Sequence, residues 1–268
     1  MREIDRLQFE IHAKSTAFRY KLEEARAIVD SAIALNVSGY VAFSGGLDST
    51  VVLDLVLKVK PDFNVFWIDD GADYRETLQF VEETAIQRKC RIQYIRGVKA
   101  WGQWCREMGR PDLVGPGEAM DAAWINPISH WDEQWLSDTQ YPRMLYERGL
   151  GLCFTGMMAS ESKNRNLVLE KGYRPLYQRG KFGEWSCCPL AKWQKRDVWA
   201  YIVSHHLPYN NVYNKLAELD IPLQHRRVGP LTCFRIMHYG THGHVLKHVD
   251  YELYNRLSNV FPKIREYS

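Results

Sequence analysis

Residues 40–57, Tyr-Val-Ala-Phe-Ser-Gly-Gly-Leu-Asp-Ser-Thr-Val-Val-Leu-Asp-Leu-Val-Leu, decide the fold. The first four residues are strand formers and predict a short buried strand. Residues 44–49 are too small and polar for a core and predict a tight loop, and the apolar run after them predicts a helix that Asp48 or Ser49 is expected to cap. Paired glycines let backbone N–H groups approach a phosphate, so the loop and the helix N-terminus together predict an anion site.

The loop differs from two common phosphate-binding motifs. It lacks the Gly-x-x-x-x-Gly-Lys-[Ser/Thr] pattern of the Walker A loop and the Gly-x-Gly-x-x-Gly pattern of dinucleotide folds. Its sequence, Ser-Gly-Gly-Leu-Asp-Ser at 44–49, resembles the PP-loop of the ATP-pyrophosphatase superfamily, the adenine nucleotide alpha-hydrolase-like group. The resemblance implies that the loop holds the pyrophosphate end of ATP, which that family splits between the α and β phosphates.

A second strand is predicted at residues 64–68, parallel to the first, and polar residues follow it where ligands bind in open parallel sheets. Residues 69–77 resemble the Asp-Thr-Gly-x-x-Phe-Pro-Glu-Thr signature of phosphoadenosine phosphosulfate (PAPS) reductase-like proteins. The matching positions are Asp69, Gly71, Glu76 and Thr77, whereas Asp70 replaces Thr and Arg75 replaces Pro. Glu76 also fits the acidic first turn of a helix, and the two roles are compatible. A helix to about residue 89 and a third strand at 91–95 complete a doubly wound pattern.

A fourth strand is predicted at residues 150–155, and a second family motif follows it. Residues 156–165 resemble Gly-x-Arg-x-x-Glu-Ser-x-x-Arg, in which Gly156, Glu161, Ser162 and Arg165 match. Met158 stands where the family has Arg, which removes one cation from the expected phosphate site. Efficient turnover, or at least the usual substrate of the family, is therefore not assured for this chain. Residues 187–213 resemble the family's Pro-Leu-x-x-Trp-x-x-x-Asp-Val-Trp-x-Tyr-Ile … Leu-Pro-x-Asn-x-x-Tyr element, which we interpret mainly as structural.

The predicted fold class is α/β, a doubly wound, mostly parallel sheet with helical additions at both ends. Residues 1–38 form an N-terminal helical segment, expected to be one long helix or two. A PP-loop nucleotide-binding domain covers residues 39–213 and carries a Trp-rich helical insertion at about 99–149. Tryptophans there would stack bases or, more commonly, fill a core. Residues 214–268 form a basic, His-rich C-terminal segment.

Composition places the chain among cytoplasmic proteins. Its 268 residues are 46% apolar, enough for a substantial core, yet no apolar run is long enough for a transmembrane helix. The charged N-terminus does not resemble a secretory signal, and six cysteines without a Cys-x-x-Cys pair indicate a reduced compartment. A homo-oligomer is left open.

The net charge of +3 hides an asymmetry between the two parts of the chain. Residues 151–268 hold 17 Lys and Arg against 9 Asp and Glu, a net charge of +8. A basic half beside a phosphate loop predicts a polyanionic partner, with a nucleic acid as the simplest candidate. An uneven but solvated surface is the alternative, and the two stay open.

The C-terminal histidines raise the question of a metal site. Their positions are His238, His242, His244 and His248. A His-x-x-x-His spacing places two ligands on one face of a helix, but Gly240 and Gly243 are expected to interrupt a helix there. A zinc site is therefore not expected.

The cysteines are candidates both for ligands of an iron–sulfur cluster and for a thiol nucleophile. Cys187, Cys188 and Cys233 offer at most three ligands from two places, so an iron–sulfur cluster is not expected. PAPS reductases of the family use a cysteine in a C-terminal Glu-Cys-Gly-x-His tail, and no cysteine follows Cys233 in this chain. The expected thiol nucleophile is therefore missing from its place.

The leading hypothesis is a Mg²⁺-dependent enzyme that cleaves ATP to AMP and pyrophosphate and adenylates an acceptor, either a nucleic acid or a sulfur-transfer substrate such as a sulfur-donor protein. A sulfonucleotide reductase with a relocated cysteine and a non-catalytic nucleotide-sensing or nucleic-acid-binding regulator are the alternatives. Catalytic roles are expected for Asp48, which would also bind Mg²⁺, and for Arg165. The residues expected to bind the nucleotide are Ser44, Gly45, Gly46, Asp48, Ser49, Asp69, Gly71, Glu76, Gly156, Glu161 and Ser162.

Overall fold

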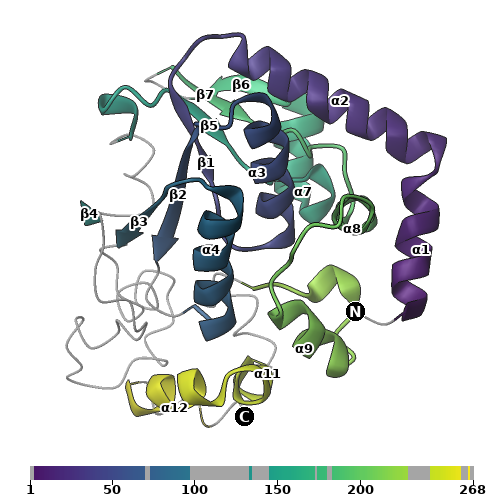
Figure 1. The fold of residues 1–268 in the computed structure, drawn as a ribbon, viewed down its shortest axis with the longest axis vertical. Coiled ribbons are helices and arrows are strands. Elements are labelled where there is room, and N and C mark those ends of the chain that lie inside the picture. Colours follow the sequence, from purple (N-terminus) through teal and green to yellow (C-terminus); the bar gives the residue numbers. More distant parts are fainter. Residues whose placement is uncertain are drawn as a thin grey trace. The chain divides into compact units, whose positions relative to one another are not determined.

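The structure, a computed structural model, describes residues 3–69, 73–96, 133–134, 145–172, 174–179, 183–228, 242–260 and 265 (Figure 1). Its strands are β1 (Gly39–Ala42), β2 (Asn64–Asp69), β3 (Ile92–Arg96), β4 (Glu133–Gln134), β5 (Leu152–Phe154), β6 (Leu176–Arg179) and β7 (Glu184–Cys187). They form a seven-stranded sheet in the order β4-β3-β2-β1-β5-β7-β6. β1 pairs in parallel with β2 and β5, β5 with β7 and β3 with β4, whereas β6 runs antiparallel to β7. The predicted α/β class with a mostly parallel sheet is confirmed.

The sheet order reverses at β1. Tyr40 of β1 pairs with Asn64 of β2 on one side and with Cys153 of β5 on the other. The chain therefore adds strands outward in one direction and then in the other, which makes β1 a topological switch point. Ligands of open α/β sheets bind beyond the carboxyl ends of the strands at such a point, so the segments after β1 and β5 are where a ligand is expected.

The helices are α1 (Glu3–Ala13), α2 (Thr16–Ile33), α3 (Leu47–Val59), α4 (Arg75–Arg88), α7 (Lys163–Asn166), α8 (Lys195–Ser204), α9 (Val212–Glu218), α11 (His242–Val249) and α12 (Tyr251–Val260). Shorter turns lie at Ala159–Glu161 and Leu223–His225, both 3₁₀, and at Leu167–Gly172, a π-helical turn. The N-terminal helical prediction is confirmed as two helices rather than one. Ser15 separates them, and its Oγ caps α2 by accepting a hydrogen bond from the Phe18 N–H at 3.2 Å.

The hairpin β6–β7 lies in a stretch where the sequence shows no strand signal. Leu176 pairs with Cys187 and Arg179 with Glu184, and Gly183 adopts a positive φ of 75° between the two strands. Each strand has only four residues. Runs this short show too little alternation of apolar and polar residues to be distinguished from a basic loop.

A buried carboxylate joins three helices at the N-terminal end of the chain. Asp197 of α8 is fully buried, and its oxygens lie 2.7 Å from Lys21 Nζ of α2 and 2.7 Å from His12 Nε2 of α1. The Gln194 N–H also donates to it at 2.7 Å. Burial acts to raise the pKa of Asp197, but the hydrogen bonds from Lys21, His12 and Gln194 outweigh burial and lower the pKa below its ordinary value of 3.8.

The lowered pKa of Asp197 predicts how the free energy of unfolding depends on pH. Because the pKa of Asp197 is lower in the folded state than in the unfolded state, its stabilisation is complete above 3.8 and is lost as the pH falls through the folded pKa. Urea unfolding at about pH 6 and about pH 3 is therefore expected to show a marked loss of unfolding free energy in acid. The loss should be smaller in Asp197→Asn, and an equal loss in both proteins would contradict the prediction.

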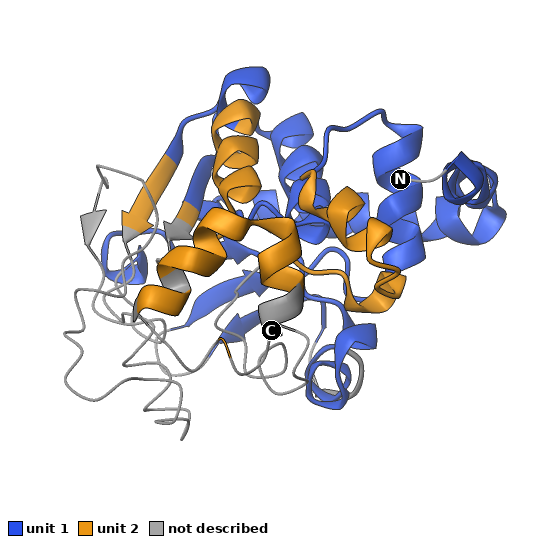
Figure 2. Cartoon of the chain, turned by 90° about the horizontal axis from the view of Figure 1, so that it is seen from below, with its two compact units in different colours: residues 1–66, 85–92, 142–209 blue, residues 67–84, 93–141, 210–268 orange. Residues whose placement is uncertain are grey.

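The chain divides into two compact units (Figure 2). Unit 1 comprises residues 1–66, 85–92 and 142–209, and unit 2 comprises residues 67–84, 93–141 and 210–268. The domain boundaries at residues 38 and 213 stay predictions. Most of the Trp-rich insertion at 99–149, including all five of its tryptophans, lies outside the described residues. Within the described ranges, no helix has both the length and the apolar character needed to cross a membrane.

The C-terminal histidine region differs from its prediction at one position. Gly243 lies inside α11, which begins at His242, so the expectation that this glycine interrupts a helix is wrong. Leu246 and Val249 of α11 are buried, and this apolar face outweighs the modest cost of one glycine. His238 and Gly240 lie outside the described residues.

Candidate nucleotide-binding site

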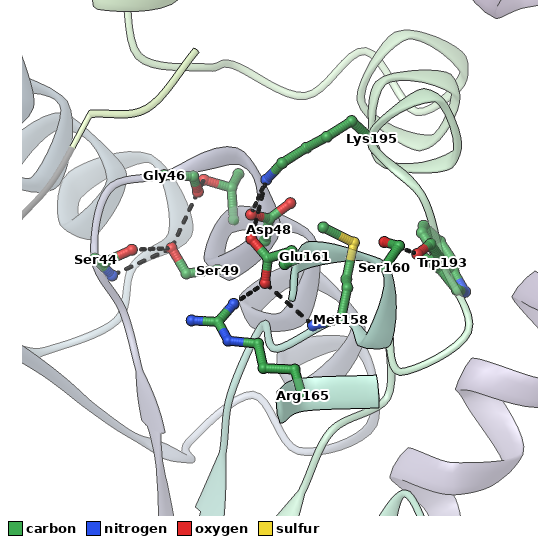
Figure 3. Close-up of polar contacts among 11 residues, drawn as sticks. Ser44, Gly46, Asp48, Ser49, Met158, Ser160, Glu161, Arg165, Trp193 and Lys195 are labelled. Atoms are coloured by element: carbon green, nitrogen blue, oxygen red, sulfur yellow. Dashed lines mark hydrogen bonds and ion pairs between the residues drawn. The ribbon is translucent and has the colours of Figure 1, made fainter. Parts of the chain in front are cut away.

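The loop after β1 is closed by hydrogen bonds between its own residues (Figure 3). The Ser44 N–H donates to Ser49 Oγ at 3.1 Å, and the two hydroxyl oxygens lie 3.0 Å apart. Ser49 Oγ in turn donates to the Gly46 carbonyl at 3.0 Å. Gly45 sits at a φ of 68°, a conformation that glycine adopts without strain. Ser44, Gly45, Gly46 and Ser49 therefore form one compact turn at the carboxyl end of β1.

The cap prediction for α3 is wrong. The helix begins at Leu47, so Asp48 and Ser49 lie in its first turn, and the N-cap is Gly46, without a side-chain hydrogen bond. The hydroxyl of Ser49 serves the loop instead of the helix end. Amides in the first turn of a helix have no acceptor within the helix, and the helix dipole adds partial positive charge there. This is the kind of position at which proteins bind phosphates.

Gly156 brings the second motif against the first. It follows β5, and a Cβ on it would lie 2.9 Å from both the carbonyl carbon and the Cβ of Asp48 and 3.1 Å from the Ser49 nitrogen. Only a residue without a side chain allows this approach. The segments after β1 and β5 therefore meet at the switch point of the sheet, as the sheet order leads one to expect.

The remaining residues of the second motif form an ionic network with the loop (Figure 3). Glu161 Oε2 accepts a hydrogen bond from the Met158 N–H at 3.3 Å and pairs with Arg165. Ser162 caps α7 by accepting from the Arg165 N–H at 3.1 Å. Lys195, the first residue of α8, pairs with Asp48 Oδ2, and its Nζ lies 3.8 Å from Glu161 Oε1. Two cations thus alternate with two carboxylates beside the loop.

Lys195 is a residue that sequence reasoning missed, because it lies in the element interpreted as structural. Hydrogen bonds hold this element against the second motif: the Ala159 N–H donates to the Ala191 carbonyl at 2.9 Å, and Ser160 Oγ donates to the Trp193 carbonyl at 2.9 Å. One sequence signal was available. A lysine at the start of a helix is disfavoured by the partial positive charge of the helix N-terminus, so its presence there indicates a role outside the helix.

The second-strand motif belongs to unit 2. Glu76 lies in the first turn of α4 and pairs with Lys215 of α9, which also donates to the Val249 carbonyl at 2.6 Å. Buried Thr77 accepts a hydrogen bond from the Asn210 side chain at 2.8 Å, which joins two family motifs inside this unit.

The two other predicted residues of this motif have no described side-chain geometry. Asp69 ends β2 and its side chain lies outside the description, as does Gly71 altogether. Asp69 and Gly71 therefore stay predictions.

Comparison with known proteins gives a family match and two sequence relatives. The model of the phosphoadenosine phosphosulfate reductase domain matches residues 39–112 and 139–236. An uncharacterized protein of Methanocaldococcus jannaschii is 31% identical over 176 residues, which are 65% of this chain and 33% of that protein. The phosphoadenosine 5'-phosphosulfate reductase of Xanthomonas oryzae pv. oryzae is 28% identical over 176 residues. The chain spans a third of the first relative and 64% of the second.

The fold is also similar to that of a solved adenylyltransferase. Candida glabrata FMN adenylyltransferase, in complex with FMN and the ATP analogue AMPCPP, superposes with a TM-score of 0.51 over 80% of this chain and 67% of that one. The identity is 11%, so this likeness concerns the fold alone. The family model, in contrast, matches well over half of the sequence. The chain therefore belongs to the phosphoadenosine phosphosulfate reductase domain family, with an adenine nucleotide alpha-hydrolase-like fold.

Proposed function

We propose that the protein binds ATP at residues 44–49, cleaves it between the α and β phosphates and adenylates an acceptor. The observation that carries the proposal is the contact of Gly156 with Asp48, which joins two separate family motifs at a helix N-terminus and at the switch point of the sheet. That the fold neighbour was crystallised with an ATP analogue supports the choice of nucleotide. The family match supports an adenine nucleotide over other phosphate ligands.

We assign the proposed roles from the hydrogen-bond donors and charged groups of the site. Ser44, Gly45, Gly46 and Ser49 contact the pyrophosphate end of ATP through backbone amides and hydroxyls, and Arg165 contacts a phosphate. Glu161 and Ser162 orient Arg165, since one pairs with its guanidinium and the other caps its helix. Gly156 keeps space for the first turn of α3, and Asp69, Gly71 and Glu76 are proposed to contact the nucleotide on the resemblance alone.

The reaction needs no nucleophile from the protein. The acceptor atom bonds to the α-phosphorus while the bond between the α-phosphorus and the oxygen that bridges to the β phosphate breaks. Pyrophosphate leaves with the electron pair, and the proton of the acceptor passes to water. The protein contributes by positioning the phosphates and by balancing the charge that develops on them, which are large terms in phosphoryl chemistry.

Asp48 fits a magnesium ion. Its Oδ1 is buried and accepts no hydrogen bond from any described residue, so lone pairs remain for a cation. Mg²⁺ prefers oxygen ligands and one or two carboxylates beside substrate phosphates. When bound, it supplies neutralisation of phosphate charge.

The sulfonucleotide reductase alternative requires a reactive thiol. Cys187 and Cys188 are both fully buried, and burial raises the pKa of each thiol. A raised pKa leaves little thiolate at neutral pH, and the thiolate is the nucleophile. Cys233 lies outside the described residues and stays open for this role. Thioredoxin-dependent release of sulfite from PAPS would identify it.

The regulator alternative draws on Met158. Its side chain is fully buried and brings no charge to the loop, as expected for a site that binds a nucleotide without turning it over. Exchange of labelled pyrophosphate into ATP separates the two functions, because a sensor binds ATP without exchange.

The acceptor class rests on charge. Residues 151–268 carry a net charge of +8, which favours a polyanionic acceptor such as a nucleic acid over a neutral small molecule. Binding of that kind weakens steeply with salt, because each neutralised phosphate releases counterions. A sulfur-donor protein is the other acceptor that we propose, on the resemblance alone.

Gly46→Asp tests the phosphate loop. The new side chain puts bulk and negative charge at the N-cap of α3, so calorimetry with ATP and Mg²⁺ is expected to show a loss of affinity of at least about tenfold, or about 1.4 kcal/mol. Ala27→Asp, which adds the same charge on the exposed face of α2, should bind as wild type. Equal affinities in wild type and Gly46→Asp would refute the placement of the phosphates.

A further inference from the structure

We propose that Lys195 of α8 contacts phosphate at the loop, and that it leaves Asp48 for the pyrophosphate end of the nucleotide when ATP binds. The inference rests on the proposed function for the identity of the ligand. The anion site itself is argued separately, from the loop at residues 44–49 and the first turn of α3.

Lys195 reaches into the loop from a distant part of the chain. Its Nζ pairs with Asp48 Oδ2 in the first turn of α3 and lies 3.8 Å from Glu161 Oε1. Its side chain is 15% exposed, against 56% for Lys192 three residues earlier. Figure 3 shows the side chain pointing to Asp48 and Glu161, the carboxylates of the two phosphate-side motifs.

Two effects disfavour the placement of Lys195 at the start of α8 with its side chain largely buried. Ordering and partly burying a lysine removes rotamer freedom from its long side chain. The first turn of α8 also carries partial positive charge, which disfavours a cation. A lysine needed only for solubility would stay in solvent, as Lys192 does.

The network of Lys195, Asp48, Glu161 and Arg165 does not by itself balance the negative charge of ATP, because each of its cations already pairs with a carboxylate. Arg165 pairs with Glu161, and the side chain of Met158 carries no charge. Lys195 holds the carboxylate proposed for the metal, so release of Asp48 frees an oxygen ligand and a cation in one movement. A lysine ammonium is a compact charge with three donors on a flexible stem, suited to following a phosphate over such a short path.

Isothermal titration with inorganic pyrophosphate and Mg²⁺ tests the contact directly. Lys195→Met is expected to weaken pyrophosphate binding by at least about tenfold, the loss that corresponds to one hydrogen bond between charged groups. Lys195→Arg keeps the charge and should retain most of the affinity. Lys192→Met, which removes an exposed lysine paired with Glu24, should bind as wild type. If Lys195→Met does not fold, Lys195→Gln, which keeps a donor for Asp48, carries the same test.

The outcomes separate this inference from the proposed function. Pyrophosphate affinity that is equal in wild type and Lys195→Met overturns the inference, even if ATP–pyrophosphate exchange proceeds. Loss of pyrophosphate binding in Lys195→Met, with recovery in Lys195→Arg, supports the inference. If wild type then fails to bind or exchange ATP, the proposed function falls while the anion site stands. A purely structural role for Lys195 would lower thermal stability and leave the affinity of the folded protein unchanged, which also overturns the inference.

Discussion

Replacing Gly156 with alanine is expected to weaken ATP binding by about tenfold or more and to destabilise the protein by roughly 1–3 kcal/mol, the range for overpacking a close contact. The new Cβ would lie 2.9 Å from two atoms of Asp48, one of them a backbone carbon. A flexible side chain could move aside, but backbone at the start of α3 moves only if the first turn and the phosphate loop move with it. Calorimetry with ATP and Mg²⁺ measures the first effect and thermal unfolding the second.

Gly183→Ala is the matched control for this variant. A Cβ there meets no atom within 4 Å among the described residues, but the φ of 75° makes alanine strained by roughly 1–2 kcal/mol. It should therefore destabilise the protein to a similar extent without changing affinity for ATP. If both variants bind ATP as wild type does, the contact between Gly156 and Asp48 has no part in nucleotide binding.

Asp54→Asn is expected to give the largest loss of stability, about 3–5 kcal/mol, the usual cost of breaking a buried ion pair by removing one partner. Asp54 lies on α3 and is 1% exposed. One oxygen lies 2.8 Å from Arg88 Nη1, and the other accepts from the Tyr201 hydroxyl at 2.7 Å and lies 2.8 Å from Lys58 Nζ. Burial acts to raise the pKa of Asp54, but Lys58, Tyr201 and Arg88 outweigh burial and lower it.

Urea unfolding of Asp54→Asn and of Lys58→Met at neutral pH tests this prediction. Lys58 is 49% exposed, so its loss leaves Asp54 with two partners and should cost about 1 kcal/mol or less, as for other solvated pairs. The Asn variant should still bind pyrophosphate once folded, because the described partners of the Asp54 carboxylate, Lys58, Arg88 and Tyr201, lie outside the loop. Similar losses of unfolding free energy in the two variants would contradict the prediction, because removing the buried carboxylate would then cost no more than removing one exposed partner.

The parts of the fold that sequence could predict are those with local causes. Tyr40 to Ala42 precede a loop with two glycines, and a mostly apolar run without Gly or Pro follows. Strand, loop and helix can therefore be predicted from neighbours alone. The cap of α3 could not be predicted, because Asp48 and Ser49 are both good caps and only the loop geometry decides that neither is used.

The contacts between motifs have no local signature. Lys195 and Asp48 are 147 residues apart in the sequence, and their pairing depends on the order in which β1 and β5 are laid side by side. Gly156 could be identified as a motif residue, but the reason for its small size is visible only once Asp48 lies opposite. The nucleotide-binding roles of all the predicted site residues, Asp69 and Gly71 included, stay predictions, since they depend on placement around a nucleotide.

The hairpin β6–β7 also determines how the protein ends its sheet. Among the described strands, β6 is the last in the sheet order, and an outermost strand offers unpaired backbone groups to an extended chain in solution. It is only four residues long, and it includes Arg179 and the exposed Gln178. A short edge strand that carries a charged residue is a poorer template for edge-to-edge pairing than a long apolar strand. We therefore expect this edge of the sheet to contribute little to self-association.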